Sequence, residues 1–256
     1  MLGEVLVEEK RNGVFLVRVE RPEKLNALNQ YLWHRLGEVV ESLCASPRAR
    51  AIVVTGSGRA FSAGDDIFEM AGLETLVESR SFFEAASRAV RALLDCSKPL
   101  VAAVEGYAYG GGFELLLLFD IVVASKSSRF SAPEARLALF PPILSTIGVA
   151  VLGYKNAKKL ALTGVELAAS EARELGVVDI IVEDGETVEK ALEIAYRLAS
   201  LPPQGVLEAK KLARKSIEAL IPVLREAVER LARLVLSPEA KESMKLFIES
   251  RKQKRK

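Results

Sequence analysis

The sequence predicts an α/β fold with a mostly parallel sheet. Short apolar runs rich in β-branched residues occupy positions 51–55, 100–104 and 121–124, and such runs are typical of strands that are covered on both faces. Stretches with helical spacing of their apolar residues lie between them, at 81–94 and 113–119. Because strand and helix alternate, neighbouring strands are expected to pair in parallel.

The N-terminal elements follow from local signals. Residues 5–9 and 14–19 are predicted to form a hairpin, with a type I′ turn at Asn12-Gly13. A helix is expected to begin after Asn29 and to end before Pro47, because one face of it carries apolar residues at helical spacing: Leu32, Leu36, Val39, Val40 and Leu43.

The character of the chain changes near residue 200. Pro202-Pro203 is followed by long periodic helices without a strand signal. Their apolar faces must pack on the main core or on another subunit. We therefore divide the chain into a core at 1–198 and a C-terminal helical region at 199–256.

Composition excludes several classes of protein. The chain has 36 basic and 34 acidic side chains, and a net charge of +2 indicates neither nucleic acid nor a membrane as the main partner. We identify neither a signal peptide nor an apolar stretch of the roughly 18 residues that a membrane span needs. The basic run at 251–256 could contact phosphate groups, but we interpret it as a solvated, frayed tail.

The cysteines and the histidine do not indicate a metal site or a catalytic site. Cys44 and Cys96 form no CxxC pair and have no neighbouring histidine, so they argue against zinc and give no support for a disulfide framework. A reducing cytoplasm fits this pattern. His34 is the only histidine, lies in a predicted helix, and is interpreted as a surface or packing residue.

Two glutamates beside apolar stretches are the main catalytic candidates. Glu114 ends the segment Gly106–Glu114, and Glu134 ends Arg129–Glu134. An ionised carboxylate in apolar surroundings must be paired or must have a shifted pKa, because its burial is costly. Paired carboxylates suit general acid/base catalysis.

Two glycine-containing loops precede helical sequence. Gly110-Gly111-Gly112 either presents backbone N–H groups to a developing negative charge or only allows tight helix–strand packing, and the motif alone leaves both open. The loop at 59–67 could supply a second set of N–H groups. No nucleotide motif is complete, since Phe61 replaces the third glycine after Gly56-Ser57-Gly58 and no P-loop occurs.

Taken in order, three segments resemble the enoyl-CoA hydratase/isomerase (crotonase) superfamily. They are Phe61–Ile67, Lys98–Leu115 and Asp120–Ala124, and the similarity extends over nearly the whole chain. The resemblance is closest to enoyl-CoA hydratases, because members with other chemistries often lack one of the two glutamates.

The resemblance implies a spiral core of ββα turns and a C-terminal helical region that builds a homotrimer or a dimer of trimers. It implies an acyl-CoA thioester as substrate, bound in the core, with no metal and no separate cofactor. The thioester oxygen would accept hydrogen bonds from the N–H groups of Asp65 and Gly111. Glu114 and Glu134 would activate a water that adds to the β-carbon, and Glu134 would deliver a proton to the α-carbon.

Contacts to the substrate are also implied by the resemblance. The positions matching contacts to coenzyme A or flanking the amide donors are Lys24, Leu25, Ala63, Gly64, Asp66, Ile67 and Gly110. Five aromatic residues either line an acyl pocket or pack in the core: Trp33, Tyr107, Tyr109, Phe113 and Phe140.

Two departures from the family pattern concern the substrate. Asp65 stands where hydratases commonly have a small residue, and its carboxylate introduces charge near the thioester unless it points away. Pro141-Pro142 replaces a glycine-rich stretch and stiffens a loop that we expect to line the acyl pocket. Alternatives are therefore isomerisation through Glu134, hydrolysis or hydration of an unusual acyl-CoA, and, in a different class, RNA binding through the basic tail.

Overall fold

A computed structural model describes residues 2–253, and its main sheet has six strands. Their order is β1-β2-β3-β5-β7-β10, and every neighbouring pair is parallel except the β1–β2 hairpin. The predicted mostly parallel sheet is confirmed. The strands are β1 (Glu4–Glu9), β2 (Val14–Glu20), β3 (Ala51–Gly56), β5 (Leu100–Val104), β7 (Ile121–Ser125) and β10 (Ile180–Val182).

A second sheet of four short strands has the order β4-β6-β8-β9. Each turn of the chain places one strand in each sheet, β3 then β4, β5 then β6, and β7 then β8, and a helix follows each pair. This is the spiral of ββα turns that the resemblance implies. The strands are β4 (Ala60–Ser62), β6 (Tyr107–Tyr109), β8 (Arg129–Ser131) and β9 (Leu167–Ala168).

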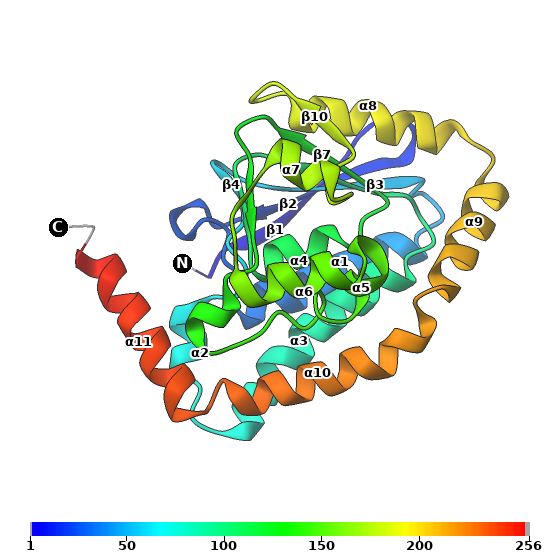
Figure 1. Cartoon of the computed structure of the whole chain (residues 1–256). Coiled ribbons are helices and arrows are strands. Elements are labelled where there is room, and N and C mark those ends of the chain that lie inside the picture. The colour runs from blue at the N-terminus through cyan, green and yellow to red at the C-terminus, as the bar shows by residue number, and fades with distance from the viewer. Residues whose placement is uncertain (1, 254–256) are drawn as a thin grey trace.

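Helices cover both faces of the main sheet (Figure 1). α1 (Gln30–Ala45) and α3 (Leu76–Asp95) lie on one face, and α8 (Thr187–Ser200) covers the other. Alternate strand residues point to each side, so Ile52 joins the α1/α3 core and Val53 packs with α8. The predicted helix between Asn29 and Pro47 is confirmed as α1, and Asn29 caps it by accepting a hydrogen bond from Leu32 N.

The remaining helices connect the sheets or belong to the C-terminal region. The α-helices are α2 (Ile67–Gly72), α4 (Gly111–Leu116), α5 (Ile147–Leu152), α6 (Tyr154–Thr163), α7 (Ala169–Glu174), α9 (Pro203–Lys215), α10 (Ile221–Leu234) and α11 (Pro238–Gln253). The short 3₁₀ helices are η1 (Arg11–Gly13), η2 (Pro22–Lys24), η3 (Glu134–Leu137) and η4 (Glu218–Leu220). Within residues 2–253, no helix combines the length and apolar character needed to cross a membrane.

The C-terminal helices pack on the core of the same chain. In Figure 1 they pass around the side of the molecule that carries α3. α10 buries Leu224 and Leu231 against α3, and the buried Ser79 hydroxyl of α3 donates a 2.6 Å hydrogen bond to Ala232 O. Association through the region 199–256 stays a prediction.

The predicted turn at Asn12-Gly13 is confirmed, because both residues adopt the positive φ that a type I′ turn requires and Val14 N donates to Arg11 O. One local prediction is corrected. The tail is not frayed at its first residues, since α11 continues through Arg251 and Lys252 to Gln253. Residues 254–256 lie outside the described part of the chain.

The cysteine prediction is wrong. Cys44, near the end of α1, and Cys96, directly after α3, form a disulfide with their Cα atoms 5.4 Å apart. The pairing was invisible in the sequence because it depends on α1 and α3 lying side by side. The argument from free cysteines to a reducing compartment no longer applies, and the cytoplasmic location stays a prediction.

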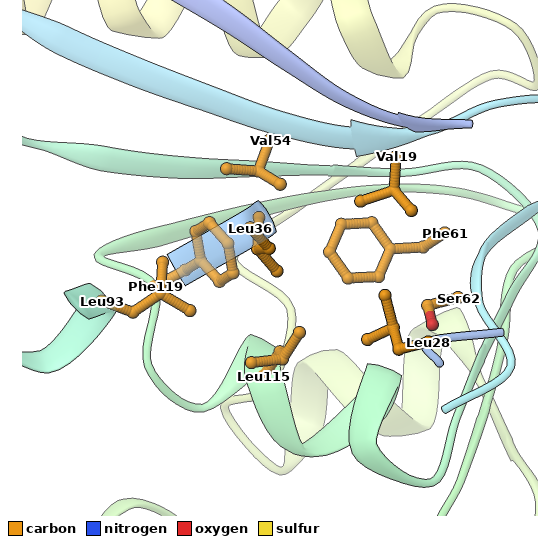
Figure 2. Close-up of a pocket in the computed structure, with 9 residues that line it drawn as sticks. All are labelled: Val19, Leu28, Leu36, Val54, Phe61, Ser62, Leu93, Leu115 and Phe119. Carbon is orange, nitrogen blue, oxygen red and sulfur yellow. The ribbon is translucent and has the colours of Figure 1, made fainter. Parts of the chain in front are cut away.

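A small void of about 10 Å³ lies in the core between the two sheets. Figure 2 shows its apolar lining, with the Phe61 ring between Val19 and Leu28. Its polar member, Ser62, has a hydroxyl that donates to Asn26 O and accepts from Gly64 N. This void is therefore a packing defect and not a ligand site.

We predict that replacing both cysteines with alanine lowers the free energy of unfolding by about 2–4 kcal/mol, because the disulfide closes a long loop in the unfolded chain. Denaturant unfolding of the wild type and of Cys44→Ala/Cys96→Ala measures the difference. Thiol titration of the denatured wild type, without reductant, is the control. Two free thiols per chain would contradict the pairing.

Candidate active site

The candidate residues gather because the three short strands β4, β6 and β8 are parallel neighbours. The carboxyl ends of parallel neighbours meet at one edge of a sheet. Ala63, Gly64 and Asp65 follow β4, Gly110 and Gly111 follow β6, and Glu134 comes shortly after β8.

Two backbone amides meet at this edge. Gly64 O accepts a hydrogen bond from Leu28 N at 2.8 Å, and Asp66 N donates to Leu28 O at 3.0 Å, so the Asp65 N–H between them is directed away from Leu28. A Cβ built on Gly64 would lie 2.8 Å from Gly111 N, and its φ is +81°. Only glycine allows this approach of the two loops.

The three glycines of the second loop have separate roles. Gly110 N donates to Ser131 O at 2.8 Å, which fixes the start of the segment. Gly111 is the first residue of α4, and the N–H groups of the first helical turn have no partner within the helix. A Cβ on Gly112 would lie 2.5 Å from Ser62 O, so this glycine serves tight packing. The packing alternative is therefore confirmed for Gly112, whereas presentation of an N–H group to a negative charge stays a prediction for Gly111.

Glu114 is buried in α4, with 3% of its surface exposed. Its Oε1 accepts a 2.7 Å hydrogen bond from Leu144 N, in the loop that follows Pro141-Pro142. Burial raises the pKa of this carboxyl well above its usual range, and the charge of Glu134 raises it further.

Glu134 is the first residue of η3 and faces the glycine segment. A Cβ built on Gly110 would lie 3.0 Å from its Oε1. Its Oε2 is buried and has no hydrogen-bond partner among the described residues. Burial raises the pKa of this carboxyl from 4.5 to about 8.

Asp65 does not point away from the site. Its Oδ1 accepts a 2.8 Å hydrogen bond from Trp33 Nε1, and its Oδ2 lies 3.8 Å from a Cβ built on Gly111. Burial raises the pKa of this carboxyl to about 6, although the Trp33 bond lowers it in part. The site thus holds three carboxyl groups with raised pKa values.

A cavity of about 130 Å³ extends from Asp65 and Glu114, whereas Glu134 does not line it. Asp65, Gly111 and Glu114 line one part of it, and the predicted pocket loop contributes Pro142 and Ile143. The rest lies between α3 and the helices α9 and α10 and is mostly apolar, with Phe83, Ala86, Val90, Leu94, Ile221, Leu224, Val228 and Leu231.

The loop predicted to contact coenzyme A is anchored beside the site. Arg21 Nη1 donates to Asp66 Oδ2 at 2.6 Å, and both residues are buried. Ala63 N donates to Leu25 O at 2.9 Å, and the Lys24 ammonium lies 3.9 Å from the centre of the Phe68 ring. Asp66 also caps α2 and its backbone N–H donates to Leu28 O, so its carboxylate and its amide are both committed to the fold.

The structure separates the other predicted residues. Trp33 lines the cavity, whereas Phe113 is completely buried in the core. Tyr109 donates a hydrogen bond to Glu166. His34 is half-exposed beside Arg88 and Glu38, as expected for a surface residue. Sequence reasoning missed the role of Leu144 N, because any residue type can supply a backbone amide.

The sequence pattern of the enoyl-CoA hydratase/isomerase family matches residues 9–256. The chain belongs to this family. Relatives within it are similar over nearly their full length. A short-chain-enoyl-CoA hydratase from Clostridium acetobutylicum is 33% identical over 250 residues, which cover 96% of this chain and 95% of the relative. A 2,3-dehydroadipyl-CoA hydratase from Escherichia coli is 33% identical over 251 residues, 96% of each chain.

Solved structures of family members share the fold. An enoyl-CoA hydratase/isomerase from Mycobacterium paratuberculosis superposes with a TM-score of 0.88 at 28% identity, over 94% of this chain and 97% of that one. An enoyl-CoA hydratase/isomerase from Pseudoalteromonas atlantica gives a TM-score of 0.84 at 32% identity, over 98% of each chain. The crotonase-like fold is thereby confirmed.

We predict that Glu134→Gln stabilises the protein at alkaline pH. The folded-state pKa is raised from 4.5 to about 8, so the carboxyl stabilises the fold below pH 4.5, and this contribution is lost as the pH rises through about 8. The variant should therefore exceed the wild type by about 1–3 kcal/mol at pH 9, and by much less at pH 4.5. Denaturant unfolding at both pH values measures this, and a difference independent of pH would contradict it.

We predict that Gly64→Ala lowers the free energy of unfolding by about 1–3 kcal/mol, because alanine is strained at positive φ and its Cβ would meet Gly111 N. Gly72→Ala in α2 is the matched control, since a Cβ there meets nothing within 4 Å. Denaturant unfolding compares the two variants. Equal stability would show that the loops do not need this close contact.

Proposed function

We propose that the protein is an enoyl-CoA hydratase that adds water across the 2,3 double bond of a 2-enoyl-CoA thioester. The observation that carries this proposal is the pair of buried carboxyls, Glu114 and Glu134, beside a glycine segment that presents a backbone N–H. Both pKa values are raised, so one carboxyl can hold a proton near neutral pH while the other accepts one. Addition of water needs both actions.

The thioester oxygen would lie between the N–H groups of Asp65 and Gly111. As water adds, negative charge moves onto this oxygen to form an enolate, and the two amides stabilise it. Loss of one such donor typically costs about 3 kcal/mol in the barrier. The contact between Gly64 and the Gly111 amide supports this role, because it sets the spacing of the two donors before substrate binds.

Each glutamate would take its own part in the proton transfers. Glu114, oriented by Leu144 N, would hold the water and take up its proton as the oxygen bonds to the β-carbon. Glu134 would supply the proton for the α-carbon from Oε2, the buried atom without a partner in residues 2–253. The hydroxyl group of the water is then bonded to the β-carbon, and the proton from Glu134 is bonded to the α-carbon. Proton transfer from Glu114 to Glu134 restores both carboxyls to their starting state.

Isomerisation is the enzymatic alternative, and the burial of Glu114 argues against it. In a reaction through Glu134 alone, the carboxyl group of Glu114 would have no function. Glutamine at this position could accept the same hydrogen bond from Leu144 N, so the fold alone does not require a carboxyl there. The relatives from Clostridium acetobutylicum and Escherichia coli are called hydratases, which supports the same choice.

The coenzyme A moiety would bind along the loop of Lys24 and Leu25, near Ala63 and Ile67. We further propose that the C-terminal region joins subunits into a trimer or a dimer of trimers. α9 supports this, because it buries none of its residues in the single chain and Leu212 is 64% exposed. The absence of a metal or separate cofactor stays a prediction.

We predict that the wild type hydrates crotonyl-CoA, and that Glu114→Gln and Glu134→Gln each lower kcat by about 10²–10⁴-fold. Loss of the conjugated-thioester absorbance follows the reaction, and mass spectrometry checks for the gain of one water. Glu174→Gln, at an exposed position of α7, is the control and should retain activity. Activity that survives Glu114→Gln, or a product of unchanged mass, would exclude the two-glutamate hydratase.

A further inference from the structure

The cavity continues well beyond the catalytic groups along α3. α1 and α3 run side by side in the same direction: Gln30 bonds Ser81 near their starts, and Cys44 bonds Cys96 near their ends. Trp33, which binds Asp65, therefore lies level with the part of α3 around Phe83, and the cavity lining on α3 runs from Phe83 to Asp95. At 1.5 Å per residue this wall is about 18 Å long.

The far part of the cavity is lined by charged residues. Arg91 and Asp95 come from the last turns of α3, Arg214 from α9 and Arg225 from α10. Arg91 is also bonded to Glu84 at 2.7 Å, so three arginines face two carboxylates and this end keeps a net positive charge of about one. The apolar wall thus leads from the carboxyl groups of the site to a cationic end. A purely hydrocarbon acyl chain long enough to reach this end would be disfavoured, because it would remove water from the charged groups without bonding them.

Arg214 has unused hydrogen-bonding capacity at this end. Its Nη2 donates to Asp95 Oδ1 at 3.2 Å, a long contact to a carboxylate that is itself 65% exposed. Its Nε and Nη1 are buried and have no hydrogen-bond partner among the described residues. Buried guanidinium donors are costly unless they are bonded, and the planar fork suits a carboxylate.

We infer that the enzyme takes acyl-CoA substrates whose acyl chain ends in a carboxylate, with Arg214 binding that group and Arg225 adding positive charge. The inference rests on the proposed function, because it assumes a thioester held by Asp65 and Gly111. The apolar wall between α3 and α10 would contact the methylene groups between the thioester and the terminal carboxylate.

The phosphates of coenzyme A are a second set of anionic groups in the same ligand. Coenzyme A carries phosphates, and these would also be attracted to arginine. The predicted coenzyme A contacts lie on the loop of Lys24 and Leu25, which packs on β4 and α2 and not on α9. The terminal carboxylate is therefore the group assigned to Arg214, and free coenzyme A serves as the control ligand.

Binding of saturated, unreactive thioesters tests the inference without requiring catalysis. Calorimetry compares adipyl-, suberyl- and sebacyl-CoA with hexanoyl-, octanoyl- and decanoyl-CoA. We expect the carboxylate-ended thioester to bind about 10- to 100-fold more tightly at one or more lengths, the range of a charge-assisted hydrogen bond. Arg214→Gln should remove this preference. Lys215→Gln, which removes a charge from the next, exposed position of α9, should keep it.

The outcomes separate this inference from the proposed hydratase. Equal binding of the two series overturns it, and so does an Arg214→Gln variant that keeps the preference. If Arg214→Gln weakens both series and free coenzyme A alike, the arginine binds a phosphate and the inference is wrong. A preference that depends on Arg214, in a protein that hydrates no matching 2-enoyl-CoA, would support the inference and refute hydration.

Discussion

The contact between the loop after β4 and the loop after β6 is the constraint on which the site depends. Gly64 lies against the Gly111 amide, at a distance where any side chain would collide with the backbone. This approach places the N–H groups of Asp65 and Gly111 beside each other, and it requires β4 and β6 to be parallel neighbours, which pair across a register shift between Ala60 and Ser62. The main sheet, α1 and α3 form the core that holds the two loops in place.

The burial of acidic groups is the cost of this arrangement. Asp65, Glu114 and Glu134 all have raised pKa values, because the apolar surroundings disfavour their ionised forms. The protein offsets part of that cost with single hydrogen bonds, from Trp33 to Asp65 and from Leu144 to Glu114. Strained or destabilised groups that persist in a stable fold are typical of functional sites.

The C-terminal helices complete the site as well as the fold. Leu224 and Leu231 of α10 bury their side chains and also line the cavity, opposite the apolar face of α3. The same helical region supplies Arg214 and Arg225 at the cationic end. The proposed catalytic groups therefore come from the spiral core, whereas the proposed selectivity for the acyl chain comes from helices that the core alone does not contain.

The sequence by itself determined the elements whose signals are local. The period of apolar residues defined α1, β-branched runs defined β3, β5 and β7, and the motifs around Glu114 and Glu134 indicated the family and its site. Strands of three residues, such as β4, β6 and β8, are too short to show alternation, so only the tertiary structure revealed the second sheet. It also decided the Cys44–Cys96 pairing, the Trp33–Asp65 bond and the end of the cavity at Arg214, because each depends on contacts between segments far apart in the chain.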